Sequence, residues 1–251
     1  MTAETTGRIL QACRNCGGGA PVDVHFCPQC SQILTISRHG DYFAFLGMPR
    51  RLNLDLSDIE QRFRTLSRQF HPDYFYNATP AERRASLERS SYLNDAYRTL
   101  KNPVARVEYL LGLEGFSARG PGEDLDKINH AEGVTNRADL AAKVPAKLLE
   151  EVFALNEELD EVRGLRTSGE DPGVWRARLE RARAPIEAKQ AAHEAELTEL
   201  SARWDALGAD RGADSGRGPD REAILGALRD CVLERNYINN LLEGIERELT
   251  Q

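Results

Sequence analysis

The sequence predicts an all-α fold in which two helical units follow a small metal-binding segment at the amino terminus. Three observations lead to this prediction. Apolar residues recur at the spacing of an α-helix in several long segments. Four of the five cysteines form two Cys-x-x-Cys pairs. Of the 251 residues, 29% are charged, 20 are glycine and 11 are proline, a composition typical of a folded, helix-rich chain.

The charge balance limits the classes of partner. A net charge of −7 at pH 7 argues against a chain whose main task is to bind nucleic acid or an acidic membrane, because both need a basic surface. Positive charge is concentrated around residues 62–84. The amino terminus resembles neither a signal peptide nor a transit peptide, and no apolar run is long enough to span a membrane. We expect an intracellular soluble protein of the bacterial cytosol or, as the alternative, of the mitochondrial matrix.

Residues 1–40 are predicted to bind a metal ion. Ten residues separate the pair Cys13/Cys16 from the pair Cys27/Cys30, and two such knuckles can complete a tetrahedral thiolate site. Zinc in a closed, structural site is expected, and iron is the main rival metal. Two disulfides or a redox pair are the alternatives. His25 is expected to be a solvent-exposed loop residue, since four thiolates already fill the coordination shell.

Residues 41–113 are predicted to form the first helical unit. Asp41–Pro49 indicates a short helix that ends at Gly47, and Ser57 is expected to cap a longer helix. The apolar stripe of that longer helix is Ile59, Phe63, Leu66 and Phe70.

A turn with the sequence His71-Pro72-Asp73 follows this helix, because proline cannot continue it. Arg64 and Arg68 lie opposite the apolar stripe and, with Arg62, make the solvent face basic. Because this basic face lies next to the turn on an otherwise acidic chain, we interpret it as a docking surface for an acidic partner rather than an ordinary solvated face. A second amphipathic helix is predicted over Ser91–Leu100, with Leu93, Ala96, Tyr97 and Leu100 on one side.

Two antiparallel helices joined by His-Pro-Asp, followed by Asn94-Asp-Ala-Tyr-Arg-Thr-Leu-Lys-Asn-Pro103, resemble the J domain, which activates DnaK-type ATPases. Asp41-Tyr-Phe, His71-Pro-Asp-Tyr-Phe75, Arg106-Val-Glu-Tyr-Leu-Leu111 and the four-cysteine segment are similar to HscB-type co-chaperones of iron–sulfur cluster assembly, in particular those that bind zinc. The resemblance implies that His71, Pro72 and Asp73 stimulate the chaperone with help from Arg62, Arg64 and Arg68. Tyr74 stands where many J domains have a basic residue.

The carboxyl-terminal part is predicted to be a linker, residues 114–144, and a three-helix bundle, residues 145–251. In the helix 145–165, Leu148, Val152, Leu155, Leu159 and Val162 form one stripe, and Leu149 and Phe153 lie outside it. Periodicity leaves open whether this second apolar pair is packed or exposed for docking. The resemblance implies that Leu149, Phe153, Glu157, Glu161 and Tyr237 bind an iron–sulfur scaffold protein. Ala154 stands where an acidic residue is common in that family.

The last two helices are predicted around Trp175–Leu207 and Arg221–Leu249. His193 falls on an apolar face and is expected to be a hydrogen-bonded core residue, because the sequence places no partner ligand beside it. Cys231 is expected to be a small core residue, and Tyr237 to lie off the apolar stripe.

The sequence contains no nucleophile, glycine-rich phosphate loop or carboxylate pair beside His71, so no enzyme is predicted. We expect a co-chaperone that brings an iron–sulfur scaffold protein to a DnaK-type, HscA-like chaperone and stimulates its ATPase. The alternative is a general J-domain adaptor for other clients, in which the zinc-binding segment recruits protein or nucleic acid. A redox role for the cysteine pairs is a third hypothesis.

Overall fold

The computed structural model describes residues 10–36, 41–116, 149–209 and 218–250. The chain divides into two compact units, Met1–Leu110 and Leu111–Gln251, which are described separately. Most of the linker predicted over 114–144 lies outside the described residues. No helix in the described ranges combines the length and the apolar character needed to cross a membrane.

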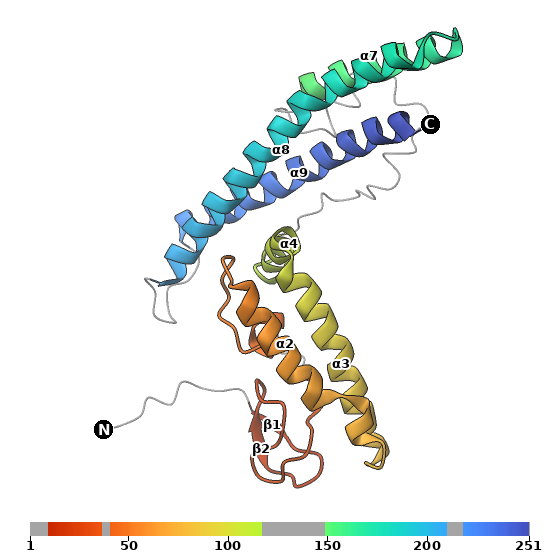
Figure 1. Cartoon of the computed structure of the whole chain (residues 1–251). Helices are drawn as coiled ribbons and strands as arrows, with labels where there is room; N and C mark the ends of the chain where they lie inside the picture. The colour runs from red at the N-terminus through yellow and green to blue at the C-terminus, as the bar shows by residue number, and fades with distance from the viewer. Residues whose placement is uncertain (1–9, 37–40, 117–148, 210–217, 251) are drawn as a thin grey trace. The chain divides into compact units, whose positions relative to one another are not determined.

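The first unit joins a small β-hairpin to a helical hairpin (Figure 1). Strands β1 (Leu10–Ala12) and β2 (Gly19–Pro21) are antiparallel, with Leu10 opposite Pro21. Its helices are α1 (Tyr42–Phe45), α2 (Leu56–Phe70), α3 (Pro80–Lys101) and most of α4 (Pro103–Leu113). A 3₁₀ helix, η1 (Pro72–Phe75), lies between α2 and α3.

The predicted apolar stripes of α2 and α3 face each other. Ile59 and Phe70 of α2 are fully buried, as are Leu93 and Leu100 of α3. Phe63 and Tyr97, which are partly buried, stack with their ring centroids 4.2 Å apart. The amphipathic pattern therefore predicted the hairpin and its core correctly.

Two helix starts differ from the predictions. Asp55, not Ser57, caps α2, because the Asp55 carboxylate accepts the Ser57 amide at 2.9 Å while Ser57 already lies inside the first turn. Helix α3 begins at Pro80, well before Ser91, with a capping box between Thr79 and Glu82. The early part of α3 was missed because its buried positions include Ser86 and Arg89, which do not register as an apolar stripe.

The second unit is a three-helix bundle of α7 (Leu149–Thr167), α8 (Pro172–Ala209) and α9 (Pro219–Thr250). Helix α8 continues through Pro185 and lies along α9. The stripe predicted for α7 is confirmed at the positions that the structure describes, and the start of that helix at 145–148 lies outside them. One buried cluster of the core consists of Val152, Leu155, Val162, Trp175, Leu179, Ile186, Tyr237, Ile238 and Ile245.

The prediction that Tyr237 lies off the apolar face of its helix is wrong. Its side chain is only 8% exposed and belongs to the bundle core. The single-stripe interpretation failed because α9 packs against both α8 and α7, so that α9 buries a wider face than one stripe.

Candidate functional site

The four predicted metal ligands come together in the first unit. The Sγ atoms of Cys13, Cys16, Cys27 and Cys30 all lie within 4.8 Å of one another. Cys13–Cys30 and Cys16–Cys27 are each separated by 3.7 Å. A tetrahedral zinc ion with Zn–S bonds of about 2.3 Å requires Sγ–Sγ distances of about 3.8 Å. The thiols are therefore positioned to share one ion, and all five cysteines are free of disulfides.

Each pair of cysteines belongs to a backbone knuckle of the same design. In the first, the Gly17 amide donates to Cys13 O at 2.9 Å; in the second, the Ser31 amide donates to Cys27 O, also at 2.9 Å. Gly17 and Ser31 both adopt positive φ, at 73° and 57°. Hydrogen bonds from the Gln32 backbone and the Asn15 side chain lower the pKa of the Cys30 thiol to about 6. This favours the thiolate at Cys30, whereas the pKa of Cys16 is lowered by a hydrogen bond with the Gly18 backbone but raised overall to about 11 by hydrogen bonds with the neighbouring thiols, that of Cys30 first.

The prediction that His25 is a solvent-exposed loop residue is wrong. Its ring packs edge-on against Phe45 and Phe70, with centroid distances of 4.8 and 5.0 Å. Burial and, next, the charge of Arg89 lower the pKa of His25 to about 4. The ring is therefore neutral at pH 7, and its Nδ1 accepts a 2.7 Å hydrogen bond from Arg89 Nη1.

Arg89, on α3, ties the cysteine segment to the helical hairpin. It is 2% exposed and donates to Leu34 O at 2.6 Å and to Thr35 O at 3.3 Å. Its guanidinium also lies over the rings of Phe45 and Phe70. The sequence could not indicate this role, because an arginine in a charged helix normally lies at the surface.

Helix α3 also holds Phe70, the residue that precedes the His-Pro-Asp turn, through two serines near Arg89. The carbonyl of Phe70 accepts hydrogen bonds from Ser86 Oγ at 2.6 Å and Ser90 Oγ at 3.0 Å. Phe70 itself is fully buried. The end of α2 is thereby held against α3, and the cysteine segment contacts the Phe70 ring through His25.

The turn itself presents polar groups to solvent. His71 leaves the helical conformation at φ −57° and ψ 127°, and its Nδ1 accepts the Asp73 amide at 3.3 Å. The side chains of His71 and Asp73 are 52% and 85% exposed. Tyr74 and Tyr76, at 75% and 77%, extend the exposed surface beyond the turn. The periodicity of the sequence carried no signal for these two tyrosines.

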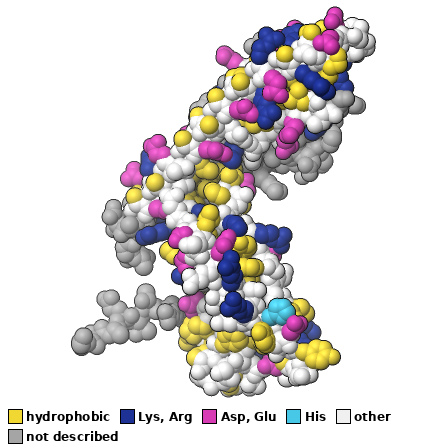
Figure 2. Space-filling view, in the orientation of Figure 1, with side chains coloured by type: hydrophobic (Ala, Val, Ile, Leu, Met, Phe, Trp, Pro, Cys, Tyr) yellow, Lys and Arg dark blue, Asp and Glu magenta, His cyan; other side chains and the backbone are white. Residues whose placement is uncertain are grey.

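The three predicted arginines do not have the same surroundings. Arg64 and Arg68 are exposed on α2, and Arg64 lies 3.5 Å from Glu60. Arg62 instead donates to Leu46 O at 3.1 Å and Gly47 O at 2.7 Å, so it holds the end of α1. Figure 2 shows Lys and Arg side chains over α2, with a histidine near the end of that helix.

On α7, the predicted partner-binding residues follow one line along the helix at intervals of four. Phe153 is half-buried, and Glu157 is exposed. Glu161 pairs with Arg178 of α8, which also contacts Glu158 at 2.5 Å. Leu149 begins α7, but the placement of its side chain lies outside the described part. Tyr237 does not join this exposed line, since it is in the core.

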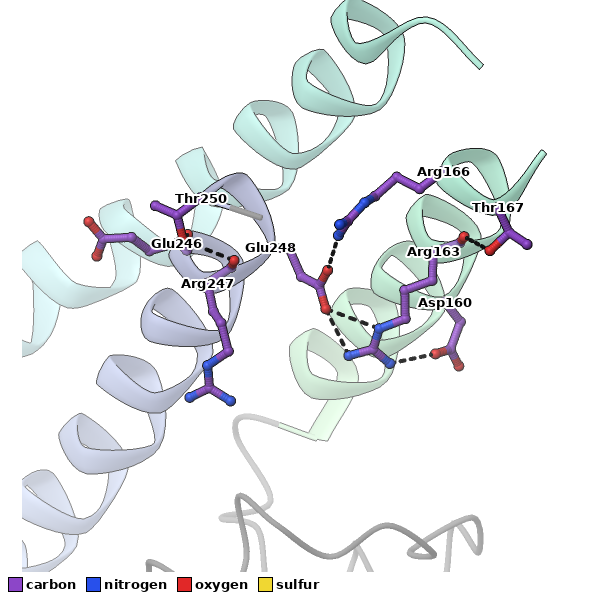
Figure 3. Close-up of polar contacts among 8 residues, drawn as sticks. All are labelled: Asp160, Arg163, Arg166, Thr167, Glu246, Arg247, Glu248 and Thr250. Carbon is purple, nitrogen blue, oxygen red and sulfur yellow. Dashed lines mark hydrogen bonds and ion pairs between the residues drawn. The ribbon is translucent and has the colours of Figure 1, made fainter. Parts of the chain in front are cut away.

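The carboxyl-terminal end of α7 is fixed to α9 by a charge cluster (Figure 3). Glu248 accepts from Arg163 Nε at 3.0 Å and from Arg166 Nη1 at 2.8 Å. Arg163 also contacts Asp160 at 3.2 Å. With the side chain of Glu248 only 9% exposed, these pairs set how α7 lies on the bundle.

Comparisons with known proteins identify the fold. The family model of the DnaJ domain matches residues 41–109. The crystal structure of human co-chaperone protein HscB is 24% identical, has a TM-score of 0.61, and the match covers 94% of this chain and 98% of that chain. Chaperone HscB from Vibrio cholerae is 26% identical with a TM-score of 0.54, and its match covers 82% and 96%. The chain therefore contains a J domain and shares the fold of the HscB structures.

The two kinds of match cover different parts of the chain. The DnaJ model spans α1 to α4 and contains His71, Pro72 and Asp73. The likeness to the HscB structures extends over nearly the whole chain, so it includes the helical bundle. The J domain and bundle predicted from the sequence are thus both confirmed.

Proposed function

We propose that this HscB-type protein binds an iron–sulfur scaffold protein and delivers it to a DnaK-type, HscA-like chaperone, whose ATPase it stimulates. The observation that carries the proposal is the exposed His71-Pro72-Asp73 turn, held rigidly at the end of a basic helix in a chain with the HscB fold. The hydrolysis takes place on the chaperone, and this protein acts as adaptor and trigger.

The chaperone-binding surface would consist of the turn with Arg64 and Arg68. Both arginines project from α2 into solvent, and they would attract an acidic surface on the chaperone. Because exposed charges are screened by salt, this contact should weaken as ionic strength rises. Arg62 contributes indirectly, since its guanidinium is used to hold α1 against α2.

The scaffold-binding surface would be the line of Leu149, Phe153, Glu157 and Glu161 on α7. An apolar side chain inside an acidic rim fits a partner that offers an apolar contact and basic residues. Arg178 orients Glu161 from the neighbouring helix. Tyr237 would contribute by packing in the core, since it is largely buried.

Calorimetric titration of this chain with the scaffold protein tests this surface directly. We expect calorimetry to detect binding of the wild-type chain to the scaffold protein, and Leu149→Ala and Phe153→Ala each to weaken it by about 1–3 kcal/mol. Val174→Ala is the matched control, because Val174 is 48% exposed in the same bundle. An absence of binding by the wild type would contradict the proposal and favour the general adaptor. Equal binding by all variants would place the contact elsewhere.

Zinc is the metal that we propose for Cys13, Cys16, Cys27 and Cys30. Four thiolates suit a structural zinc ion, which would supply folding free energy to a segment whose core contains only a few side chains. The site also favours a reducing compartment, the bacterial cytosol or the mitochondrial matrix, where free thiols persist.

Removing this ion should unfold the cysteine segment selectively. After treatment with a strong chelator under reducing conditions, we expect loss of NMR amide dispersion for residues 10–36, while helices α2 and α3 persist in far-UV circular dichroism. Readdition of zinc should restore the spectrum. A segment that keeps its dispersion after complete removal of the metal would show that its few core contacts and Arg89 are sufficient.

A further inference from the structure

The bundle contains a second group of side chains of types that can bind a metal ion, in addition to the four cysteines of the first unit. His193 and Glu196 of α8 and Cys231 of α9 place one ligand atom each within 4.8 Å of one another. His193 Nδ1 lies 3.8 Å from Cys231 Sγ and 3.9 Å from Glu196 Oε2. His193 and Cys231 are 6% and 3% exposed. The sequence did not suggest this group, because Cys231 lies 38 residues after His193, on another helix.

A fourth residue orients the imidazole. His193 Nε2 lies 3.1 Å from the carboxylate of Glu234, whose side chain is 8% exposed. With Nε2–H donated to Glu234, the lone pair of Nδ1 faces Cys231 and Glu196. Histidine ligands of metal ions commonly have this arrangement, in which a carboxylate on the second nitrogen fixes the tautomer. A buried His–Glu pair accounts for Glu234, and the Cys231 thiol also lies 3.8 Å from His193 O. Neither contact accounts for the Glu196 carboxylate beside Nδ1.

We propose that His193, Glu196 and Cys231 bind a divalent transition metal ion, with zinc as the natural occupant and Glu234 as the orienting residue. Tetrahedral zinc requires N–S ligand distances of about 3.6 Å and N–O distances of about 3.4 Å, so the distances from His193 Nδ1 to Cys231 Sγ and to Glu196 Oε2 need to shorten by only about 0.2 and 0.5 Å. Cys231 would lose its proton on binding. The side chain of Glu196 is 48% exposed, which leaves the fourth position for water on the solvent side. The ion would join α8 to α9.

Cobalt(II) titration of the full-length chain, freed of metal and kept reduced, tests the proposal. We expect two ions per chain: one with the intense thiolate-to-cobalt absorption of a four-thiolate site, and one with the weaker absorption of a single thiolate. Glu196→Gln should lower the affinity of the second ion at least tenfold, and Cys231→Ser should remove its thiolate absorption. Glu199→Gln, an exposed acid one turn further along α8, is the control and should change neither.

Glu196 lies partly at the surface, so its variant should fold even if Cys231→Ser does not. Binding of one cobalt ion per chain, or a second ion whose affinity is the same in Glu196→Gln and Glu199→Gln, would overturn the proposal. The test does not depend on the proposed chaperone function, because its readout is the number and the spectrum of bound ions.

Discussion

His71→Gln is expected to reduce stimulation of the chaperone's ATPase at least tenfold, to near its basal rate. The imidazole is half-exposed, and its Nδ1 accepts the Asp73 amide, so it both shapes the turn and forms part of the contact surface. Glutamine has a flexible side chain, and its amide has no fixed equivalent of Nδ1. Single-turnover ATP hydrolysis by the chaperone, measured against the concentration of the variant, checks this result.

The fold and the scaffold binding should be unaffected by His71→Gln. The side chain lies outside the core, so the thermal midpoint should change by no more than about 1–2 °C, as for most surface substitutions. Asn77→Ala, an exposed change just beyond η1, serves as the matched control and should retain stimulation. Full stimulation by His71→Gln would refute the proposed mechanism.

Arg89→Met is expected to destabilise the first unit by about 2–4 kcal/mol. Methionine fills similar space but cannot donate to Leu34 O, Thr35 O or His25 Nδ1. Hydrogen bonds from a charged donor are worth about 1.5–3 kcal/mol each, and leaving buried acceptors unpaired adds a penalty. Burial of the guanidinium is itself costly and lowers the pKa of Arg89 to about 10. Removing this buried charge offsets part of the loss.

Urea denaturation monitored by circular dichroism measures the stability change for Arg89→Met. Arg84→Met provides the matched control, because Arg84 is exposed on the same helix. Hydrogen exchange should also accelerate over residues 25–36 and at the Phe70–Tyr74 turn, since His25 and Phe70 share the contact with Arg89. Equal stabilities of the two variants would show that Arg89 is not needed to join the cysteine segment to the helices.

The accuracy of the sequence predictions depended on how local each signal was. The Cys-x-x-Cys spacing, the proline after His71 and the stripe from Ile59 to Phe70 are short-range features, and the structure confirms the arrangement that each predicted. Short-range spacing constrains backbone geometry directly, through the turn and the helical period. The start of α3 could also have been predicted, since Thr79, Pro80 and Glu82 form a capping box signature.

By itself, the sequence determined most of the helices, the clustering of the four cysteines and the turn that ends α2. The tertiary structure alone decided the surroundings of His25, Arg89, Tyr237 and His193. Arg89 contacts residues 55 and 64 positions earlier in the chain, and His193 meets Cys231 across two helices. Whether a polar or aromatic side chain is buried depends on partners brought by the fold, because burial is favourable only where those partners satisfy its hydrogen bonds. No local pattern carries that information.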